Sequence, residues 1–571
     1  MFRWFKKILN RKYFQLGLIA PLVLLVTNGS VGTPPGKATP VEFRISLSQK
    51  AYLGITDLGL QTPVNGRIYV IIARDGSDEP RLQIDVLGPP FWGKDIFGFT
   101  PDKWVSLSDY DADVIGYPYS KIAELPPGDY FIQAFLNVYT TFQRADGHVV
   151  LMHQDAGDGQ WLWESPGNAY SQVMPFHLEK EWRGKIDLDL TEVIQPDQPL
   201  QPGQVLQQGN YTDTDWVKYI KIRSDVLSAF WGQDMYIGAN ILLPKGYAEN
   251  PDTFYPVIYL QGHFPGSGAP FGFRPTNAFG QFWTSDTAPR FIAVTFRDAN
   301  PYYDTSYSVD SANVGPYGQS IQNELIPYIE TNFRVLREPY ARILAGGSTG
   351  GWEALAMKVF NPDFYGGTWA WCPDGIDFHY FQLVNVYEHD NAYYTFRDYI
   401  QVEQPSARSA DNLVRFTIKQ ENDWERAMGT NDRSGGQWDI WEAVYTPLGP
   451  DGYPMPVWDP VTGDIDHAVA DYWKNYDLNY IIQQRWAELA PKLSGALTTT
   501  VGMQDTYFLE EAVYLFDEFV QKANPPAQIG FDYGFRKPHC WRGASPTDPS
   551  QQMTYQEFIV IASNWVEAHR P

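Results

Sequence analysis

The sequence predicts an α/β protein, with a mostly parallel sheet covered by helices on both faces, preceded by an antiparallel β-sandwich domain. Two observations carry this prediction. From Trp216 onward, apolar runs such as "YPVIYLQG" and "ARILAGG" alternate with helical segments such as "SIQNELIPYIETNF", which is typical of a covered parallel sheet. From about Val41 to Leu190, strand-like runs broken by turns follow one another without a long helical period, which favours an antiparallel sandwich.

The N-terminal segment has the pattern of an export signal. Five Lys or Arg residues stand among the first twelve, and an apolar run from Leu16 to Val26 follows. That run has the length of a signal-peptide core and is short for a membrane span. We therefore expect a signal peptide over residues 1–29 and a secreted or periplasmic protein. A retained signal anchor, which would attach the protein to a membrane, is the alternative.

Domain boundaries follow from changes in pattern. We expect the β-sandwich domain over residues 41–190, with "GRIYVIIAR", "PRLQIDVLG" and "GDYFIQAFLNVYTTF" as strands. A linker rich in Pro, Gln and Gly is expected over residues 191–214, because it lacks an apolar period. The second domain is expected over residues 215–571. Within it, residues 378–477 break the alternation and are read as an insertion, either a lid above the sheet or a solvated decoration.

Composition narrows the classes of partner. The net charge is −24, so a nucleic-acid partner is not expected. Aromatic residues make up 16% of the chain, which suits platforms that stack on sugar rings or aromatic acyl groups, and equally suits β-rich cores. The alternate aspartates Asp109, Asp111 and Asp113 lack the Gly and Glu that complete a calcium loop. We expect neither a metal ion nor a cofactor.

The stretch "ILAGGSTGGWEALAMKVF", residues 343–360, places Ser348 on a turn between a strand and a helix. Its first residues form a short apolar run, and Trp352, Leu355 and Val359 share one face of the helix that follows. A serine in G-x-S-x-G on such a turn is a nucleophile elbow, where the backbone is strained and a Cβ at the flanking glycines would collide with neighbouring elements. The alternative is a Gly-rich phosphate-binding turn, but no second phosphate signature follows.

A serine hydroxyl needs a base, and the base needs a carboxylate that orients it. In α/β-hydrolases these residues follow in the order Ser, acid, His, each after a strand. Asp505 follows "ALTTTVG" and His539 follows "IGFDYGF", so we expect the triad Ser348, Asp505, His539. Asp374 and Asp377, after the strand "GTWAWC", are the alternative acids.

The oxyanion that forms during acyl transfer needs preorganised N–H donors. One should be the backbone N–H of Thr349, at the start of the helix. The other should be a backbone N–H in the turn after "YPVIYL". It could belong to His263 or to Phe264, and the sequence does not distinguish the two.

The chain has two cysteines, Cys372 and Cys540. In an exported protein such a pair is a candidate disulfide. Cys540 directly follows His539 and Cys372 follows an apolar strand, so both should lie at the carboxyl edge of one sheet. Two unpaired buried thiols are the alternative.

The motifs "QGHFPG", "ELIPYIETNFR", "GGSTGGWEA", "VGMQD" and "PHCW" together resemble the esterase family of α/β-hydrolases that includes esterase D, feruloyl esterases and enterochelin esterases. The resemblance covers the chain from about Trp216 to the C-terminus, apart from the insertion, and Gln261 departs from it where the family usually has His. It implies an α/β-hydrolase fold and matches Ser348, Asp505 and His539 to the family's nucleophile, acid and base.

We therefore expect an exported serine esterase that acts on a small-molecule or polymer-linked ester through an acyl-enzyme. The alternatives are an acyltransferase or a serine peptidase with the same triad, and a catalytically silent carbohydrate-binding protein. The sequence predicts no oligomeric state.

Overall fold

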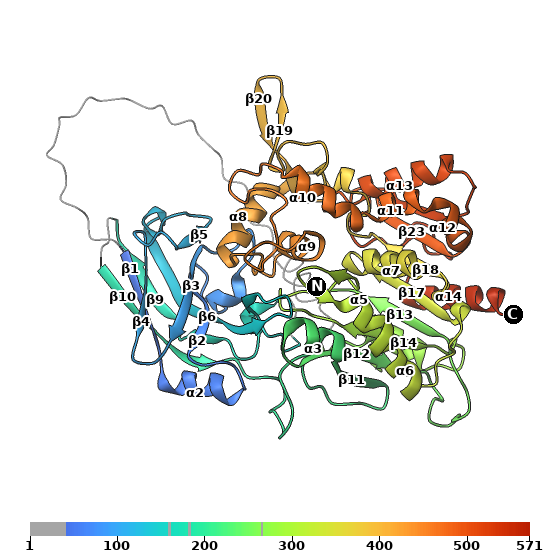
Figure 1. Ribbon diagram of the computed structural model, residues 1–571, viewed down its shortest axis with the longest axis horizontal. Helices are drawn as coiled ribbons and strands as arrows, with labels where there is room; N and C mark the ends of the chain where they lie inside the picture. The colour runs from blue at the N-terminus through green and yellow to red at the C-terminus, as the bar shows by residue number, and fades with distance from the viewer. Residues whose placement is uncertain (1–40, 158–160, 181–183, 264–265) are drawn as a thin grey trace.

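Two large β-sheets organise the chain, one from its N-terminal part and one from its C-terminal part (Figure 1). The computed structural model describes residues 41–157, 161–180, 184–263 and 266–571. The predicted signal peptide over residues 1–29 lies outside this range. None of the helices within it combines the length and the apolar character that crossing a bilayer needs.

The N-terminal sheet has ten strands, and its main path runs in the order β4, β1, β10, β8, β6, β2, β3, β5, with β7 and β9 paired to β6. The strands are β1 (Val41–Leu47), β2 (Val64–Ala73), β3 (Phe91–Phe99), β4 (Trp104–Ser108), β5 (Ile115–Tyr117), β6 (Gly128–Gln143), β7 (Val149–Met152), β8 (Ala169–Ser171), β9 (Met174–Leu178) and β10 (Gly184–Val193). These strands form one hydrogen-bonded sheet, so the predicted two-sheet sandwich is not confirmed. β1 and β10 are also parallel, since helix α2 (Gln49–Asp57) and eight further strands separate them in sequence, which leaves ample chain for the crossover.

One predicted strand of this region is wrong. The run "PRLQIDVLG" begins with a 3₁₀ helix, Pro80–Gln83, and continues without a strand. Pro80 has no N–H to donate to a ladder, and the Arg81 backbone N–H instead donates to Gln133 Oε1 at 3.1 Å. Residues 80–88 are therefore not part of the strand ladder.

The C-terminal sheet has eight strands in the order β11, β12, β14, β13, β17, β18, β23, β24. They are β11 (Val217–Ser224), β12 (Met235–Leu242), β13 (Val257–Gln261), β14 (Ile292–Arg297), β17 (Arg342–Gly347), β18 (Thr368–Trp371), β23 (Leu497–Gly502) and β24 (Gly530–Gly534). β12 is antiparallel to both of its neighbours, and the strands from β14 to β24 are parallel. The predicted mostly parallel sheet is therefore present, and its strands β13, β17, β23 and β24 all end at one edge.

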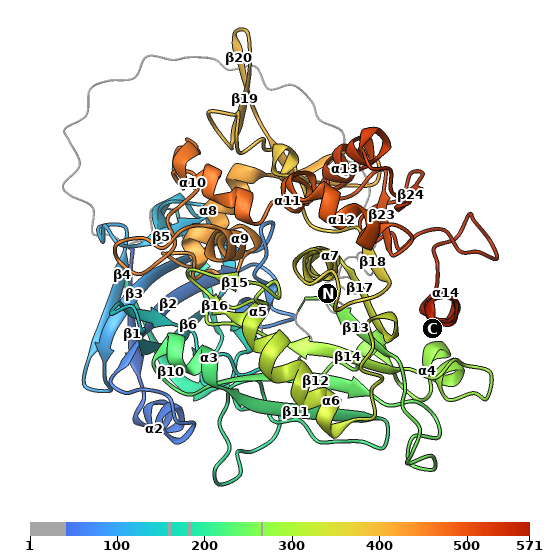
Figure 2. The ribbon, with the colours of Figure 1, turned by 45° about the vertical axis from the view of Figure 1, so that its right-hand side comes forward.

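Helices pack against this sheet. They are α3 (Asp225–Trp231), α4 (Ala278–Trp283), α5 (Tyr317–Ser320), α6 (Ile326–Asn332), α7 (Thr349–Phe360), α11 (Leu478–Gln484), α12 (Trp486–Leu493), α13 (Glu510–Lys522) and α14 (Tyr555–His569). Helices α4 and α14 lie together beside the sheet (Figure 2), where Trp371 of β18 meets Phe558 of α14 with ring centroids 4.9 Å apart. Helix α7, predicted to be amphipathic, is buried along every residue from Thr349 to Val359, because the insertion covers its second face.

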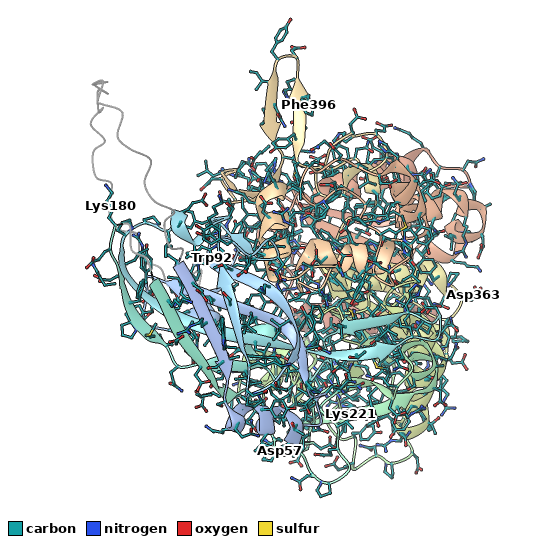
Figure 3. All side chains as sticks on the ribbon, turned by 60° about the vertical axis from the view of Figure 1, so that its left-hand side comes forward. Asp57, Trp92, Lys180, Lys221, Asp363 and Phe396 are labelled. Carbon is teal, nitrogen blue, oxygen red and sulfur yellow. The ribbon has the colours of Figure 1, made fainter. Side chains whose placement is uncertain are left out.

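The segment 378–477 lies between β18 and β23 in sequence. It contains the helices α8 (Ile418–Met428), α9 (Gln437–Tyr445) and α10 (His467–Tyr472). It also contains two antiparallel strand pairs, β19 (Tyr394–Arg397) with β20 (Ile400–Glu403), and β21 (Pro405–Arg408) with β22 (Val414–Thr417). It bridges the two sheets, since Arg433 forms an ion pair with Asp95 of the N-terminal sheet at 2.7 Å. Tyr445 of α9 also packs on Trp352 of α7, with ring centroids 5.3 Å apart. Figure 3 shows Phe396 on the hairpin β19–β20, which projects from the body of the molecule.

Candidate active site

Ser348 stands alone between β17 and α7, with φ 61° and ψ −127°. Only a tight turn places a non-glycine residue in this part of the backbone map. A Cβ at Gly346 would lie 2.1 Å from Gly350 O, and a Cβ at Gly350 would lie 2.2 Å from Gln261 O. Two of the flanking positions therefore accept only glycine, because the turn passes so close to the end of β13.

His539 and Asp505 meet Ser348 at the carboxyl ends of the strands. His539 Nε2 lies 2.9 Å from Ser348 Oγ, and His539 Nδ1 lies 2.7 Å from Asp505 Oδ2. Asp505 is fully buried, and its Oδ1 accepts the Tyr507 backbone N–H at 2.9 Å. The three residues that the chain order selected are thus joined by hydrogen bonds, in the order serine, histidine, carboxylate.

The surroundings of His539 determine how readily it takes a proton. Burial favours the neutral imidazole, but the Asp505 carboxylate, together with Cys540, raises the pKa of His539 well above its usual value. Tyr507 closes one side of the ring, with ring centroids 5.1 Å apart in an edge-on arrangement. A buried imidazole paired with a carboxylate on one nitrogen and a hydroxyl on the other is arranged to accept the proton of that hydroxyl.

Two of the predicted oxyanion residues, Thr349 and His263, are in contact next to the elbow. Thr349 is the first residue of α7, where a backbone N–H has no acceptor within the helix. His263 follows β13, and its Nε2 forms a hydrogen bond with Thr349 Oγ1. Phe264 lies outside the described residues. The contact between the side chains of His263 and Thr349 was not predicted; burial lowers the pKa of His263 to about 3, so this imidazole is neutral.

The two alternative acids are placed differently from Asp505. Asp374 Oδ1 lies 3.2 Å from Ser348 Oγ, so Asp374 contacts the serine and not the distal nitrogen of His539. Asp377 pairs with His379 Nδ1 at 2.7 Å and with Asn479 Nδ2 at 2.6 Å. Among the described contacts, the carboxylate on His539 Nδ1 is that of Asp505.

Cys372 and Cys540 are both free thiols in the structure. Their sulfur atoms and one ring nitrogen of His539 lie within 4.8 Å of one another. The predicted disulfide is therefore not formed here, although the two sulfur atoms are near neighbours beside the imidazole.

Three groups of described residues bring possible metal-ligating atoms within 4.8 Å of one another. They are Cys372, His539, Cys540; Asp377, His379, Asp477; and Asp432, Asp439, Glu442. In the first group His539 already uses both ring nitrogens, one toward Asp505 and one toward Ser348. A metal ion there would compete with the arrangement around Ser348.

A cavity of about 240 Å³ opens onto Ser348 and His539. Besides Ser348 and His539, residues from two other parts of the chain form its walls, which are rich in aromatic rings. The N-terminal sheet region contributes Ile84, Asp85, Val86, Trp161 and Trp163; the segment 378–477 contributes residues that include Phe416, Glu421, Trp424 and Trp441. The first set includes the run that was wrongly predicted as a strand, and nothing local in the sequence indicated that it would reach the serine.

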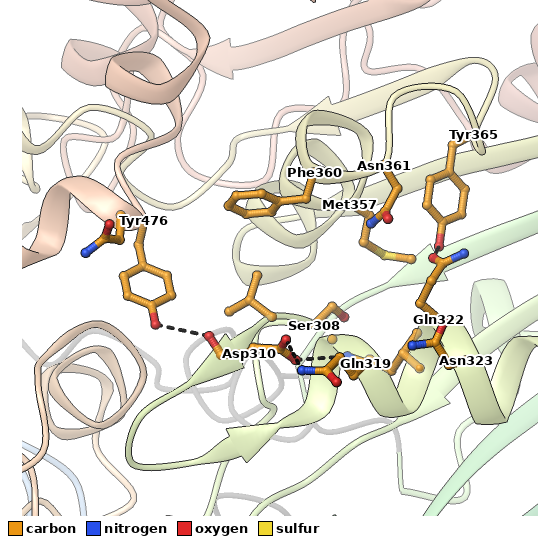
Figure 4. Close-up of a pocket in the computed structure, with 14 residues that line it drawn as sticks. Ser308, Asp310, Gln319, Gln322, Asn323, Met357, Phe360, Asn361, Tyr365 and Tyr476 are labelled. Carbon is orange, nitrogen blue, oxygen red and sulfur yellow. Dashed lines mark hydrogen bonds between the residues drawn. The ribbon is translucent and has the colours of Figure 1, made fainter. Parts of the chain in front are cut away.

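A second cavity, of about 460 Å³, lies elsewhere and contains none of the predicted site residues (Figure 4). Its polar groups are largely paired with one another: Asp310 accepts from Gln319 Nε2 at 2.8 Å, and Tyr365 OH donates to Gln322 at 2.8 Å. This second cavity thus does not hold the candidate chemistry.

Comparison with known proteins gives an esterase match over part of the chain. Residues 231–374 match the family model described as "Putative esterase", which confirms the predicted resemblance for this segment. Esterase Rv1288 of Mycobacterium tuberculosis strain H37Rv and esterase MT1326 of strain CDC 1551 are each 37% identical over 128 residues, or 22% of this chain. The match spans only 26% of the length of these relatives.

The comparison with solved structures returns esterases and other hydrolases at low identity. A ferulic acid esterase is 14% identical with a TM-score of 0.37, covering 62% of this chain and 99% of its own. The S-formylglutathione hydrolase FrmB of Staphylococcus aureus is 12% identical with a TM-score of 0.30, covering 61% of this chain and 99% of its own.

Proposed function

Residues 231–374 match an esterase family, and from that premise we propose that the protein is a serine esterase that hydrolyses carboxylic esters through an acyl-enzyme. The observation that carries the proposal is the hydrogen-bonded series Ser348, His539, Asp505 beside a cavity, with Ser348 held on a strained turn. An activated serine beside an oriented base is the arrangement that acyl transfer requires.

The proposed reaction begins with attack by Ser348 Oγ on the ester carbonyl while His539 Nε2 takes the hydroxyl proton. Asp505 holds the imidazole in the correct tautomer and stabilises the imidazolium that forms. The backbone N–H of Thr349, with a second N–H from His263 or Phe264, would bind the oxyanion. His539 then gives its proton to the departing alkoxide, which leaves the acyl group on Ser348.

Water completes the proposed cycle. His539 takes a proton from a water molecule, the resulting hydroxide attacks the acyl carbonyl, and Oγ leaves with the proton that His539 returns. The products are a carboxylic acid and the free enzyme. The aromatic walls of the cavity favour an apolar group next to the ester, and segments that connect strands of the N-terminal sheet form part of the proposed substrate site.

A serine-reactive fluorophosphonate probe, followed by a panel of 4-nitrophenyl esters, tests this proposal. We expect labelling of the wild-type protein, and its loss in Ser348→Ala together with a fall in turnover of several orders of magnitude. Ser550→Ala removes an exposed serine and serves as the matched control. Near-normal hydrolysis by folded Ser348→Ala would refute the esterase proposal.

Adding a second alcohol to the ester assay separates hydrolysis from acyl transfer. We expect free acid as the main product. Transfer of the acyl group to the added alcohol as the main product would instead identify an acyltransferase that uses the same residues.

A further inference from the structure

Asp374 is a second hydrogen-bond partner of the proposed nucleophile. Its Oδ1 lies 3.2 Å from Ser348 Oγ, the atom that His539 Nε2 approaches to 2.9 Å. The carboxyl group follows β18 and is 4% exposed. We propose that Asp374 acts as a neutral carboxylic acid whose Oδ1–H donates a hydrogen bond to Ser348 Oγ. This inference rests on the proposed function and adds one catalytic group to it.

The other oxygen of Asp374 already accepts two hydrogen bonds. Oδ2 lies 2.8 Å from Thr349 Oγ1 and 2.9 Å from Tyr307 OH. Tyr307 OH itself accepts N–H groups from Gln437 Nε2 and Trp441 Nε1, each at 2.7 Å. Its own proton is therefore available for Asp374 Oδ2. The proton of a neutral Asp374 then belongs on Oδ1, which faces Ser348.

The count of protons around Ser348 leads to the same assignment. A His539 that is ready to act as a base carries its hydrogen on Nδ1, where it donates to Asp505. Nε2 is then an acceptor, and the single hydroxyl proton of Ser348 donates to it. In this state of His539, a hydrogen bond between Ser348 Oγ and Asp374 Oδ1 needs a second proton, and a neutral Asp374 supplies it. An ionised Asp374 would instead draw the hydroxyl proton away from His539.

Burial disfavours the ionised form of Asp374, whereas hydrogen bonds from Thr349, Tyr307 and Ser348 favour it. Burial raises the pKa of Asp374, and burial also raises the pKa of Asp298 and, strongly, that of Glu353. Asp298 and Glu353 share one hydroxyl, that of Thr305, at 2.9 Å and 2.8 Å. A single hydroxyl proton cannot satisfy both acids, so one of them also holds a proton.

Titratable groups from several segments interact with Asp374. They are Tyr307, Glu353 of α7, Asp304, Tyr445 of α9 and His539. Of these, His539 is the one whose charge lowers the pKa of Asp374. If the proton moved from Asp374 to His539, the two residues would form an ion pair and His539 could no longer accept the Ser348 proton. The form of the site that can react therefore keeps this proton on Asp374.

A neutral donor on Oγ assists both halves of the proposed reaction. It stabilises the negative charge on Oγ as the hydroxyl proton moves to His539, and again when Oγ leaves during deacylation. The Asp374 proton stays on Oδ1 throughout, so the overall balance of protons and electrons is that of ester hydrolysis. A carboxylate in the same place would repel the nearby oxyanion.

Two substitutions separate a neutral donor from a charged group. Asp374→Asn keeps a donor toward Ser348 and an acceptor toward Thr349 and Tyr307, whereas Asp374→Leu has similar bulk and neither. We expect kcat/KM for 4-nitrophenyl acetate to fall about fivefold in the Asn variant and by about 100-fold or more in the Leu variant, the cost of removing one donor from a site where charge develops. Equal losses in the two variants would overturn the proposal.

Infrared spectroscopy tests the protonation state without relying on activity. The difference spectrum between wild type and Asp374→Asn, taken at a pH above the midpoint of the acidic limb where His539 is neutral, should contain the C=O stretch of a protonated carboxyl group. Bands of a carboxylate in its place would overturn the inference, even if the Leu variant fails to fold. Because this measurement needs no substrate, it remains decisive if the ester hydrolysis proposal itself fails.

Discussion

His539 Nδ1 lies 2.7 Å from Asp505 Oδ2. Asp374 and Asp377 follow β18, which lies next to β17 in the sheet, yet neither of them is the partner of this nitrogen. The acid that contacts the imidazole is thus the one after β23, and Asp374 instead contacts the serine. This arrangement gives the two carboxyl groups different expected roles, which substitutions can separate.

The first prediction concerns the acid. Asp505→Asn should lower turnover by about 10⁴, because an amide in this place would hold the imidazole in the wrong tautomer. Asp377→Asn is the control, since Asp377 bonds to His379 and Asn479 and should affect turnover far less. Steady-state kinetics on one ester measures both variants. If Asp377→Asn caused the larger loss, the assignment of the acid would be wrong.

The second prediction concerns pH. Asp505 and Cys540 raise the pKa of His539 well above its usual value, against the opposing effect of burial. The base must be neutral to accept a proton, so kcat/KM should increase as pH rises through that pKa, with a midpoint above the usual range for histidine. In Asp505→Asn the midpoint should move to lower pH. An unchanged midpoint in that variant would show that another group controls the acidic limb.

The third prediction concerns the cysteines. The thiols of Cys372 and Cys540 lie close beside His539, so in an oxidising compartment we expect a disulfide that ties the His539 loop to β18. By the loop-entropy estimate such a long closed loop would stabilise the fold by roughly 5 kcal/mol. Maleimide labelling of protein purified from such a compartment and then denatured should modify no thiol before reduction and both afterwards.

Reduction should lower activity before it unfolds the sheet, because the loop loses its tether while the core strands keep their packing. Two reactive thiols in the oxidised protein would exclude the bridge. Unchanged activity after complete reduction would show that the tether has no catalytic role.

The fourth prediction concerns the N-terminal sheet. Trp161 lines the cavity beside Ser348 and is 37% exposed, so its removal should weaken substrate contact more than stability. We expect Trp161→Ala to raise KM for an aromatic ester about tenfold, or about 1.4 kcal/mol, with kcat nearly unchanged. Trp104→Ala, a change at an exposed tryptophan of β4 that does not line this cavity, should leave KM unchanged. Equal effects would argue against a role for Trp161 in substrate binding.

Local pattern was sufficient where the chemistry lies within one short stretch of chain. The apolar run before Ser348 and the glycines around it predicted a strand, a strained turn and a helix, and the structure has β17, Ser348 at φ 61° and α7 in that order. The order of the residues along the chain then identified Asp505 and His539 as the acid and the base, since the ends of parallel strands meet at one edge of a sheet.

Tertiary structure decided what depends on which distant segments meet. The parallel pairing of β1 with β10, the burial of both faces of α7, and the presence of Trp161 beside Ser348 arise from contacts between segments far apart in sequence. A hydrophobic period of two or 3.6 residues indicates that one face of a strand or helix is buried, but it does not identify the segment against which that face packs. The proton proposed for Asp374 has the same origin. It depends on Tyr307, which donates to this carboxyl group, and on Gln437 and Trp441 of α9, which donate to Tyr307 OH from a distant segment.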